Sequence, residues 1–127
     1  MPSQLRIQRI ADRILQEISE MLIRETSDPR LSGIFPTNVK VDRELTYADI
    51  YVSAIEGKAR SAEAVDALAH ASGFFRKNLS QRIQLRTFPR LRFHWDPTPE
   101  NADRIERLII SLHQDANTSA RIDDKND

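Results

Sequence analysis

Apolar residues in the first part of the chain recur at spacings of three and four, which is the period of one face of a helix. The pattern predicts a helix from about residue 4 to residue 25. It must end before Pro29, because proline disfavours helical geometry in the residue that precedes it. The apolar face consists of Ile7, Ile10, Ile14, Ile18, Met21 and Leu22.

Two segments that follow this helix alternate between apolar and polar residues, as half-buried strands do. Pro36 indicates that the first strand begins at or near a sheet edge, since proline cannot donate to a ladder. The linking residues "DRELT" have the length of a hairpin connection. The predicted inner sides are Phe35, Thr37, Val39 and Val41 in the first strand, and Ala48, Ile50, Val52 and Ala54 in the second.

The next helix is predicted to begin near Ser61, a favourable N-cap residue. Its apolar face crosses Gly73 with little change of phase, which predicts two helices that meet at a kink. A third strand follows, and Thr98 and Pro99 then suit the start of a last amphipathic helix. The apolar positions are Ala64, Val65, Leu68, Phe75, Leu79 and Ile83 in the helix pair, Leu91, Phe93 and Trp95 in the strand, and Ile105, Leu108, Ile109 and Leu112 in the last helix.

The predicted order is therefore α-β-β-α-α-β with an additional C-terminal helix, an α+β fold. A small sheet with helices on one face would bury all these apolar stripes in one core. The 127 residues fit one domain, which we place at residues 1–114. Residues 115–127 are polar and aperiodic, so we expect a flexible tail there.

The composition narrows the classes of protein. Apolar residues make up 39% of the chain, and no stretch free of charged side chains is longer than nine residues, so no membrane span is expected. The N-terminal segment lacks the unbroken apolar run of a signal peptide. There is no cysteine, which excludes disulfides and thiolate chemistry and agrees with a cytoplasmic location.

The charge is balanced overall, with 19 basic and 19 acidic residues, but it is unevenly distributed. The segment from Gly73 to Trp95 carries six basic residues and no acid. A positive surface of this kind suits a polyphosphate backbone, because cations displace its condensed counterions. The six are Arg76, Lys77, Arg82, Arg86, Arg90 and Arg92.

Gly73 adds a second feature to this segment. If the helix breaks there, the second half begins with unpaired backbone N–H groups, and these form an anion site with the helix dipole. A glycine also lets a phosphate approach the backbone closely. Arg76 and Lys77 would lie in the first turn, where cations are unfavourable for the helix itself and are easier to explain if an anion binds.

Other interpretations remain open at this point. The basic segment could be an ordinary solvated face, a helix-turn-helix over residues 61–85 that binds DNA, or a module that meets an acidic protein partner. Tyr47 and Tyr51 could stack on bases. His94 and Asp96 are a weak metal signal, and with three glycines and no catalytic motif the chain indicates no enzyme, metal or cofactor.

Four blocks of the sequence carry a resemblance to a known family. They read "RIADRILQEISEMLIRE", "DPRL", "ASGFFRKNLSQRIQLRTFPRLRF" and "WDPTPENADRIERLI". In this order and spacing they resemble ribosome-binding factor A, a bacterial assembly factor of the small ribosomal subunit. The resemblance covers about residues 4–112.

The resemblance implies a KH-like fold of the second type, in which an Ala-x-Gly kink replaces the usual G-x-x-G loop. The kink would be formed by Ala71, Ser72 and Gly73. It also implies that the kink and the basic helix face ribosomal RNA. The protein would assist maturation of the 5′ region of 16S rRNA, especially in the cold, and would then be released.

Our hypothesis from the sequence is thus a non-enzymatic RNA-binding factor of the 30S subunit. We expect it to be a cytoplasmic monomer with no small-molecule substrate and no membrane partner. The RNA-binding residues would be Arg76, Lys77, Arg82 and Arg86, with Arg90 and Arg92 as weaker candidates.

Overall fold

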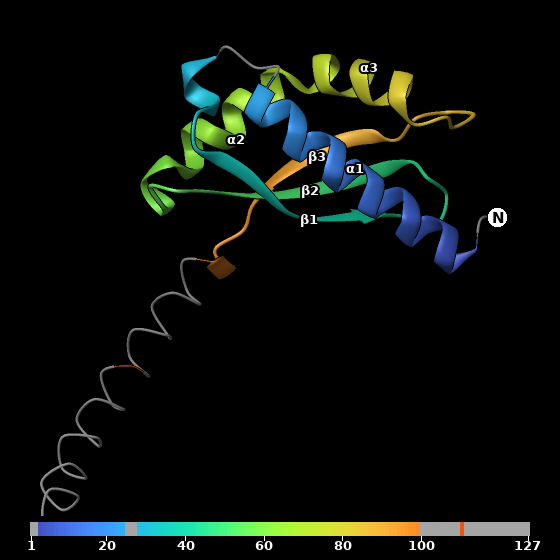
Figure 1. The fold of residues 1–127 in the computed structure, drawn as a ribbon, viewed down its shortest axis with the longest axis horizontal. Helices are drawn as coiled ribbons and strands as arrows, with labels where there is room; N and C mark the ends of the chain where they lie inside the picture. Colours follow the sequence, from blue (N-terminus) through green and yellow to red (C-terminus); the bar gives the residue numbers. More distant parts are fainter. Residues whose placement is uncertain (1–2, 25–27, 100–109, 111–127) are drawn as a thin grey trace, which may run out of the picture. The chain divides into compact units, whose positions relative to one another are not determined.

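The computed structural model describes residues 3–24, 28–99 and 110. Its helices and strands follow the predicted order α-β-β-α-α-β (Figure 1). They all lie within residues 1–96, which form one compact unit. The elements are α1 (Gln4–Arg24), the short 3-10 helix η1 (Pro29–Leu31), β1 (Ile34–Val41), β2 (Tyr47–Ala54), the 3-10 helix η2 (Lys58–Arg60), α2 (Ser61–His70), α3 (Ser72–Arg82) and β3 (Arg90–Trp95).

The sheet has the order β1-β2-β3. β1 and β2 are antiparallel and joined by residues 42–46, which confirms the predicted hairpin. β3 pairs with β2 in parallel, so the helix pair α2–α3 forms the crossover between them. β1 is an edge strand, as Pro36 predicted.

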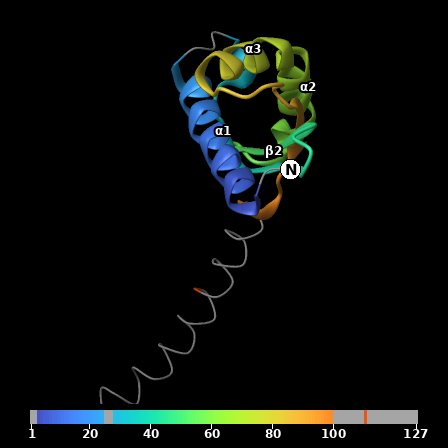
Figure 2. The same ribbon diagram turned by 90° about the vertical axis from the view of Figure 1, so that its right-hand side faces the viewer.

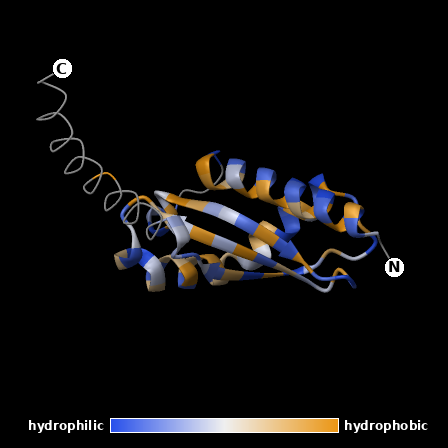
Figure 3. Ribbon diagram, turned by 90° about the horizontal axis from the view of Figure 1, so that it is seen from below, coloured by the Kyte–Doolittle hydropathy of each residue, from blue (hydrophilic) through white to orange (hydrophobic). Residues whose placement is uncertain are grey.

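The three long helices cover one face of this sheet. α1 packs on β1, α2 on β2 and β3, and α3 on β3 and α1. Viewed along the strands, the helices arch over the sheet, and from below the strands lie in front of them (Figures 2 and 3). The uncovered face carries polar side chains such as Lys40, Asp49 and His94.

The core lies between these layers and contains the predicted stripes. All six apolar positions of α1 are buried, and so are the four predicted for β2. Phe75, Leu79 and Ile83 join the same cluster from α3 and the residue that follows it. The helical period and the β2 alternation are thereby confirmed.

The first strand departs from the predicted alternation. Ile34 is buried and Phe35 is 38% exposed, the reverse of the expected phase. The register with β2 shifts between Pro36 and Asn38, so Thr37 is an extra residue in the ladder. A bulge of this kind turns the side chains before it to the other face. The prediction for Phe35 was therefore wrong, while that for Val39 was right.

The start of α2 also differs by one residue. Ser61 is the first helical residue, and Arg60 precedes it as N-cap without a side-chain capping bond. Arg60 is occupied elsewhere: it donates to the carbonyls of Ser32 (2.8 Å) and Arg30 and pairs with Glu56 (2.8 Å). Arg60 thus connects the η1 turn to the start of α2 by hydrogen bonds.

The "DPRL" block is a structured turn stabilised by its own charges. Asp28 caps η1 by accepting the Arg30 N–H (2.9 Å), and its carboxylate also pairs with the Arg30 guanidinium (3.0 Å). The side-chain hydrogen bond from Arg30 lowers the pKa of Asp28. Leu31 is buried in the core. This block is therefore explained by the fold alone.

The predicted last helix and the flexible tail fall mostly outside the described residues. Thr98 and Pro99 are helical, and Ile110 is helical and exposed. The predicted domain limit at residue 114 and the tail over 115–127 stay predictions.

Candidate nucleic-acid interface

The junction between α2 and α3 is a single residue, Ala71. α2 closes with a hydrogen bond from the Ala71 N–H to the Ala67 carbonyl, and α3 opens with one from the Phe75 N–H to the Ala71 carbonyl (both 3.1 Å). Ala71 has φ −90° and ψ 5°, in the bridge region. The ladder therefore breaks at Ala71, and Gly73, where the sequence placed the break, lies within the first turn of α3.

That first turn presents backbone donors. The N–H groups of Ser72, Gly73 and Phe74 have no carbonyl acceptor within α3, because the first residues of a helix have none. They carry the partial positive charge of the helix N-terminus. The kink thus supplies the donors expected of an anion site.

Gly73 is not required by the described part of the protein itself. Its φ is not positive, unlike that of Gly33 and Gly57, so its conformation is open to any residue. A Cβ built on Gly73 would meet no described atom within 4 Å apart from its chain neighbours and the backbone of its own helix. The glycine therefore leaves empty space beside the backbone donors, which a bound group could occupy.

Arg76 is held in place by neutral groups. Its Nε donates to the Pro89 carbonyl (3.2 Å) and its Nη2 to the Phe88 carbonyl (2.7 Å). These bonds fix the guanidinium beside the segment that leads into β3 without cancelling its charge. Arg76 is therefore a preorganised cation.

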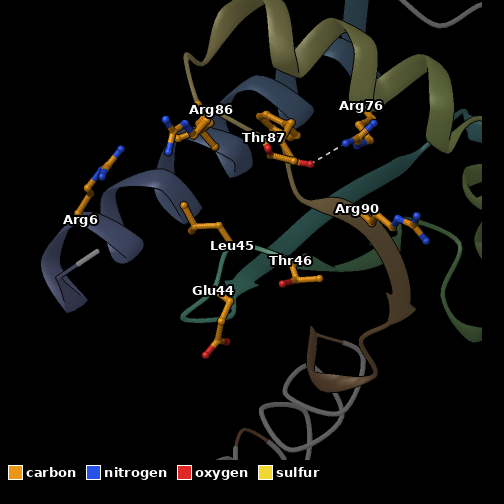
Figure 4. Close-up of a pocket in the computed structure, with 10 residues that line it drawn as sticks. Arg6, Glu44, Leu45, Thr46, Arg76, Arg86, Thr87 and Arg90 are labelled. Atoms are coloured by element: carbon orange, nitrogen blue, oxygen red, sulfur yellow. Dashed lines mark hydrogen bonds between the residues drawn. The ribbon is translucent and has the colours of Figure 1, made fainter. Parts of the chain in front are cut away.

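Three further arginines gather with Arg76 around an open hollow of about 690 Å³, which we call the arginine hollow (Figure 4). One side is the start of α1, another is the β1–β2 turn, and the third is the segment before β3. Its one acidic residue, Glu44, turns its carboxylate away from Arg86 and Thr87. The lining residues are Arg6, Glu44, Leu45, Thr46, Arg76, Leu85, Arg86, Thr87, Phe88 and Arg90.

A smaller hollow of about 260 Å³, the junction hollow, lies at the kink. It is lined by Ser72, Gly73 and Leu91 together with Arg76 and Arg90, which also line the arginine hollow. The first-turn donors and the arginines are thus contiguous. None of the four arginines pairs with a carboxylate of a described residue.

Two of the six predicted cations have a different environment. Arg82 pairs with Glu17 of α1 (3.2 Å), and Arg92 forms two hydrogen bonds with Asp49 of β2 (2.8 and 3.0 Å). Neither lines the two hollows. Each has a carboxylate partner, which Arg82 shares with Arg13 and Arg92 with His94, so both are weaker candidates for RNA contacts than the sequence suggested. Lys77 is exposed on α3 and lines neither hollow.

Asp49 links Arg92 to a wider network on the open sheet face. Partial burial raises the pKa of Asp49, but hydrogen bonds from Arg92 and His94 outweigh it and hold this pKa below its ordinary value. The Arg92 guanidinium lies 3.9 Å from the Tyr47 ring centroid, and His94 lies 5.0 Å from Tyr51 between ring centroids. The two tyrosines that could stack on bases thus already contact side chains of the protein.

Sequence reasoning missed Arg6, because 70 residues separate it from Arg76. The signal used for Arg76 and Lys77, a cation in the first turn of a helix, holds for Arg6, since the first turn of α1 contains Arg6 and no acid. For Arg76 and Lys77 that prediction was wrong, because α3 begins at Ser72 and they follow its first turn. It also missed Leu45, whose φ of 57° is unusual for a leucine and costs about 1 kcal/mol or more. No sequence pattern indicated that conformation.

Other kinds of site find no support among the described residues. They contain no group of three or more side chains that could hold a metal ion. None of their helices has the length and hydropathy that crossing a membrane requires. A helix-turn-helix needs a turn of three or four residues, whereas Ala71 alone separates α2 from α3.

Comparisons with known proteins agree with this architecture. A protein from Thermus thermophilus solved as ribosome-binding factor A has a TM-score of 0.63 at 22% identity, and the match covers 70% of this chain and 93% of the other. A Thermotoga maritima solution structure has the same TM-score at 27% identity, with 74% and 90% covered. The shared fold is KH-like, of the second type.

Sequence matches cover most of the chain. The family model described as ribosome-binding factor A matches residues 6–109. A relative of that name from Alcanivorax borkumensis is 43% identical over 105 residues, which are 82% of this chain and 77% of the relative. One from Hahella chejuensis is 37% identical, with 94% and 93% covered. From its sequence and its fold, this chain belongs to the ribosome-binding factor A family.

Proposed function

We propose that the protein is a non-enzymatic assembly factor that binds the 30S ribosomal subunit through its 16S rRNA. It assists maturation of the 5′ region of that RNA, most importantly in the cold, and then leaves the subunit. It acts as a monomer in the cytoplasm and needs no metal, cofactor or small-molecule substrate.

One observation carries this proposal: four arginines that have no carboxylate partner among the described residues adjoin a helix N-terminus with open space beside it. Arginine side chains and backbone N–H groups are the usual partners of phosphate oxygens. The two hollows share Arg76 and Arg90, so an RNA backbone could run from the kink to the start of α1. The names of the relatives point to the same kind of partner.

Sedimentation across a salt series tests the proposal. The protein should sediment with isolated small subunits but not with complete ribosomes, and binding should weaken steeply with salt, by about 0.7–0.9 in log–log slope for each phosphate contact. Binding that is independent of salt, or that survives digestion of the RNA, would point to an acidic protein partner and contradict the proposal.

The variants Arg86→Glu and Arg90→Glu test where RNA binds, because reversing these charges should weaken binding to the small subunit. These two are preferable to Arg76, whose bonds to Phe88 and Pro89 also serve the fold. Arg24 at the far end of α1 is a matched control, because it is exposed and lines neither hollow. The Arg24→Glu variant should bind nearly as the parent does.

A further inference from the structure

The arginine hollow is lined by apolar residues, which we call its floor, as well as by the four arginines, which we call its rim. Leu45 and Leu85 are half-buried and Phe88 is buried, and all three line it. Thr46 and Thr87 add hydroxyl groups between floor and rim. Phosphate groups bind the arginines but gain nothing from apolar side chains. A purely apolar ligand would leave four arginines without a partner. The combination suits a ligand with both parts.

Leu45 is placed on this floor at a cost in backbone conformation. Its φ of 57° lies in the left-handed region, where glycine or asparagine is more usual. The turn is fixed by Asp42, whose side chain accepts the N–H groups of Thr46 (2.8 Å) and Tyr47 (2.7 Å) and whose carbonyl accepts that of Leu45 (3.0 Å). Leu45 packs against the hydrophobic core on one side, and because it is only partly buried, the rest of its side chain lines the hollow.

The β1–β2 turn is also hydrogen-bonded to the start of β3. The Arg90 N–H donates to the Thr46 carbonyl (2.8 Å), and Arg76 grips the Phe88 and Pro89 carbonyls. Figure 4 shows Leu45 between the Glu44 and Arg86 sides of the hollow. These bonds connect the β1–β2 turn and Arg76 to the segment before β3.

We propose that the arginine hollow holds one unpaired nucleotide of the bound RNA, with its base on Leu45 and Leu85 and its phosphate on the surrounding arginines. The proposal rests on the proposed function and makes it more specific, because it requires single-stranded RNA. Bases in a duplex are stacked and cannot reach an apolar floor. The volume of about 690 Å³ falls within the range of roughly 300–1,000 Å³ that small-molecule sites occupy.

Three synthetic probes test this idea with the full chain at low salt: a single-stranded RNA octamer, the corresponding duplex, and an octamer without bases. We expect the single strand to bind about tenfold more tightly than either of the other two, or about 1.4 kcal/mol, which is the size of one base contact. Equal affinity for all three probes would overturn the proposal.

The Leu45→Asn variant separates the base contact from the fold. Asparagine tolerates the left-handed conformation but loses the packing of Leu45 against the core, so the melting temperature should fall and affinity is measured well below it. Affinity for the single strand should drop about fivefold. The salt slope and the affinity for the octamer without bases should stay the same. Ile23→Asn, at an 81% exposed position outside the hollow, is the control and should change neither affinity.

Arg86→Gln distinguishes failure of this inference from failure of the proposed function. If it lowers the salt slope by about 0.7 while Leu45→Asn has no effect, phosphate binding stands and the nucleotide pocket is disproved. If neither variant changes binding to RNA or to small subunits, the proposed RNA-binding surface fails with it.

Discussion

Two groups of arginines in this molecule differ in what their guanidinium groups contact. Those of the arginine hollow face open space or backbone carbonyls, and their charges are not cancelled by described carboxylates. A second group forms ion pairs of 2.8 to 3.2 Å with acids close in sequence or in space: Arg30 with Asp28, Arg60 with Glu56, Arg82 with Glu17 and Arg92 with Asp49.

The comparison shows that a count of basic residues does not locate a binding surface. Arg82, Arg86, Arg90 and Arg92 lie within eleven positions of one another, yet two support the fold and two remain available. A cation paired within the molecule attracts a phosphate less strongly, because the nearby carboxylate offsets its charge. The proposed surface therefore depends on which arginines have no carboxylate partner among the described residues as much as on which arginines are present.

Charge reversal in the hollow should have the largest effect on binding. We expect Arg86→Glu with Arg90→Glu to weaken binding to small subunits by about 100-fold at low salt, because two phosphate contacts become repulsive. The melting temperature should change little, since neither side chain has an ion pair with a described residue. Sedimentation and thermal unfolding check the two statements.

A double variant in the paired group, Arg82→Gln with Arg92→Gln, should lower stability and leave binding nearly unchanged. Stability should fall because Glu17 and Asp49 lose partners, while binding should change by less than about fivefold. A loss of binding as large as that of the hollow variant would remove the distinction between the two groups.

Arg60→Ala should affect only stability. The side chain is 17% exposed and donates to the Ser32 and Arg30 carbonyls besides pairing with Glu56. Its loss leaves those carbonyls without their donor, which should lower the free energy of unfolding by about 1–3 kcal/mol. Urea denaturation measures the change, and RNA affinity under native conditions should match that of the parent.

Acid should remove the stability that the ion pair between Asp49 and Arg92 contributes. The hydrogen bonds from Arg92 and His94 hold the pKa of Asp49 below its unfolded value of about 3.9. The stabilisation is therefore complete above that value and is lost as the pH falls through the lower, folded pKa. We expect Asp49→Asn to cost about 1 kcal/mol near neutral pH and to flatten the acid limb of the stability curve.

Gly73→Ala should have the smallest effect on stability, and a favourable one. The position is helical and a Cβ there meets no atom, so alanine should raise the free energy of unfolding by about 0.5 kcal/mol. RNA binding should nevertheless weaken severalfold, because the methyl group enters the space beside the first-turn N–H groups. A variant that is both more stable and fully active would show that nothing approaches Gly73.

Much of the fold was predictable because its apolar periods are strong. Each strong period marks one buried face, and it can be read without knowing what packs against that face. Examples are the apolar stripe of α1, the alternation in β2 and the helical spacing of Phe75 and Leu79. The bulge at Thr37 and the parallel pairing of β3 were not predictable, since both depend on the partner strand rather than on local sequence.

Only part of the candidate site could be predicted from the sequence, for a related reason. Arg76, Arg86 and Arg90 lie within fifteen residues, so their shared surface could be expected. Arg6 joins them only because α1 crosses the sheet, and Leu45 only because Asp42 bends the hairpin. Which cations would find acids was likewise decided by tertiary contacts.

The parallel pairing of β3 with β2 has a consequence for how the protein becomes active. The arginine hollow draws on residue 6, near the beginning of the chain, and on Arg90, which is in place only once β3 has joined the sheet. A chain emerging from the exit tunnel cannot complete it until β3 has been released, because distant pairing of this kind forms late. If the arginine hollow binds RNA as proposed, affinity should therefore appear only with the finished tertiary structure.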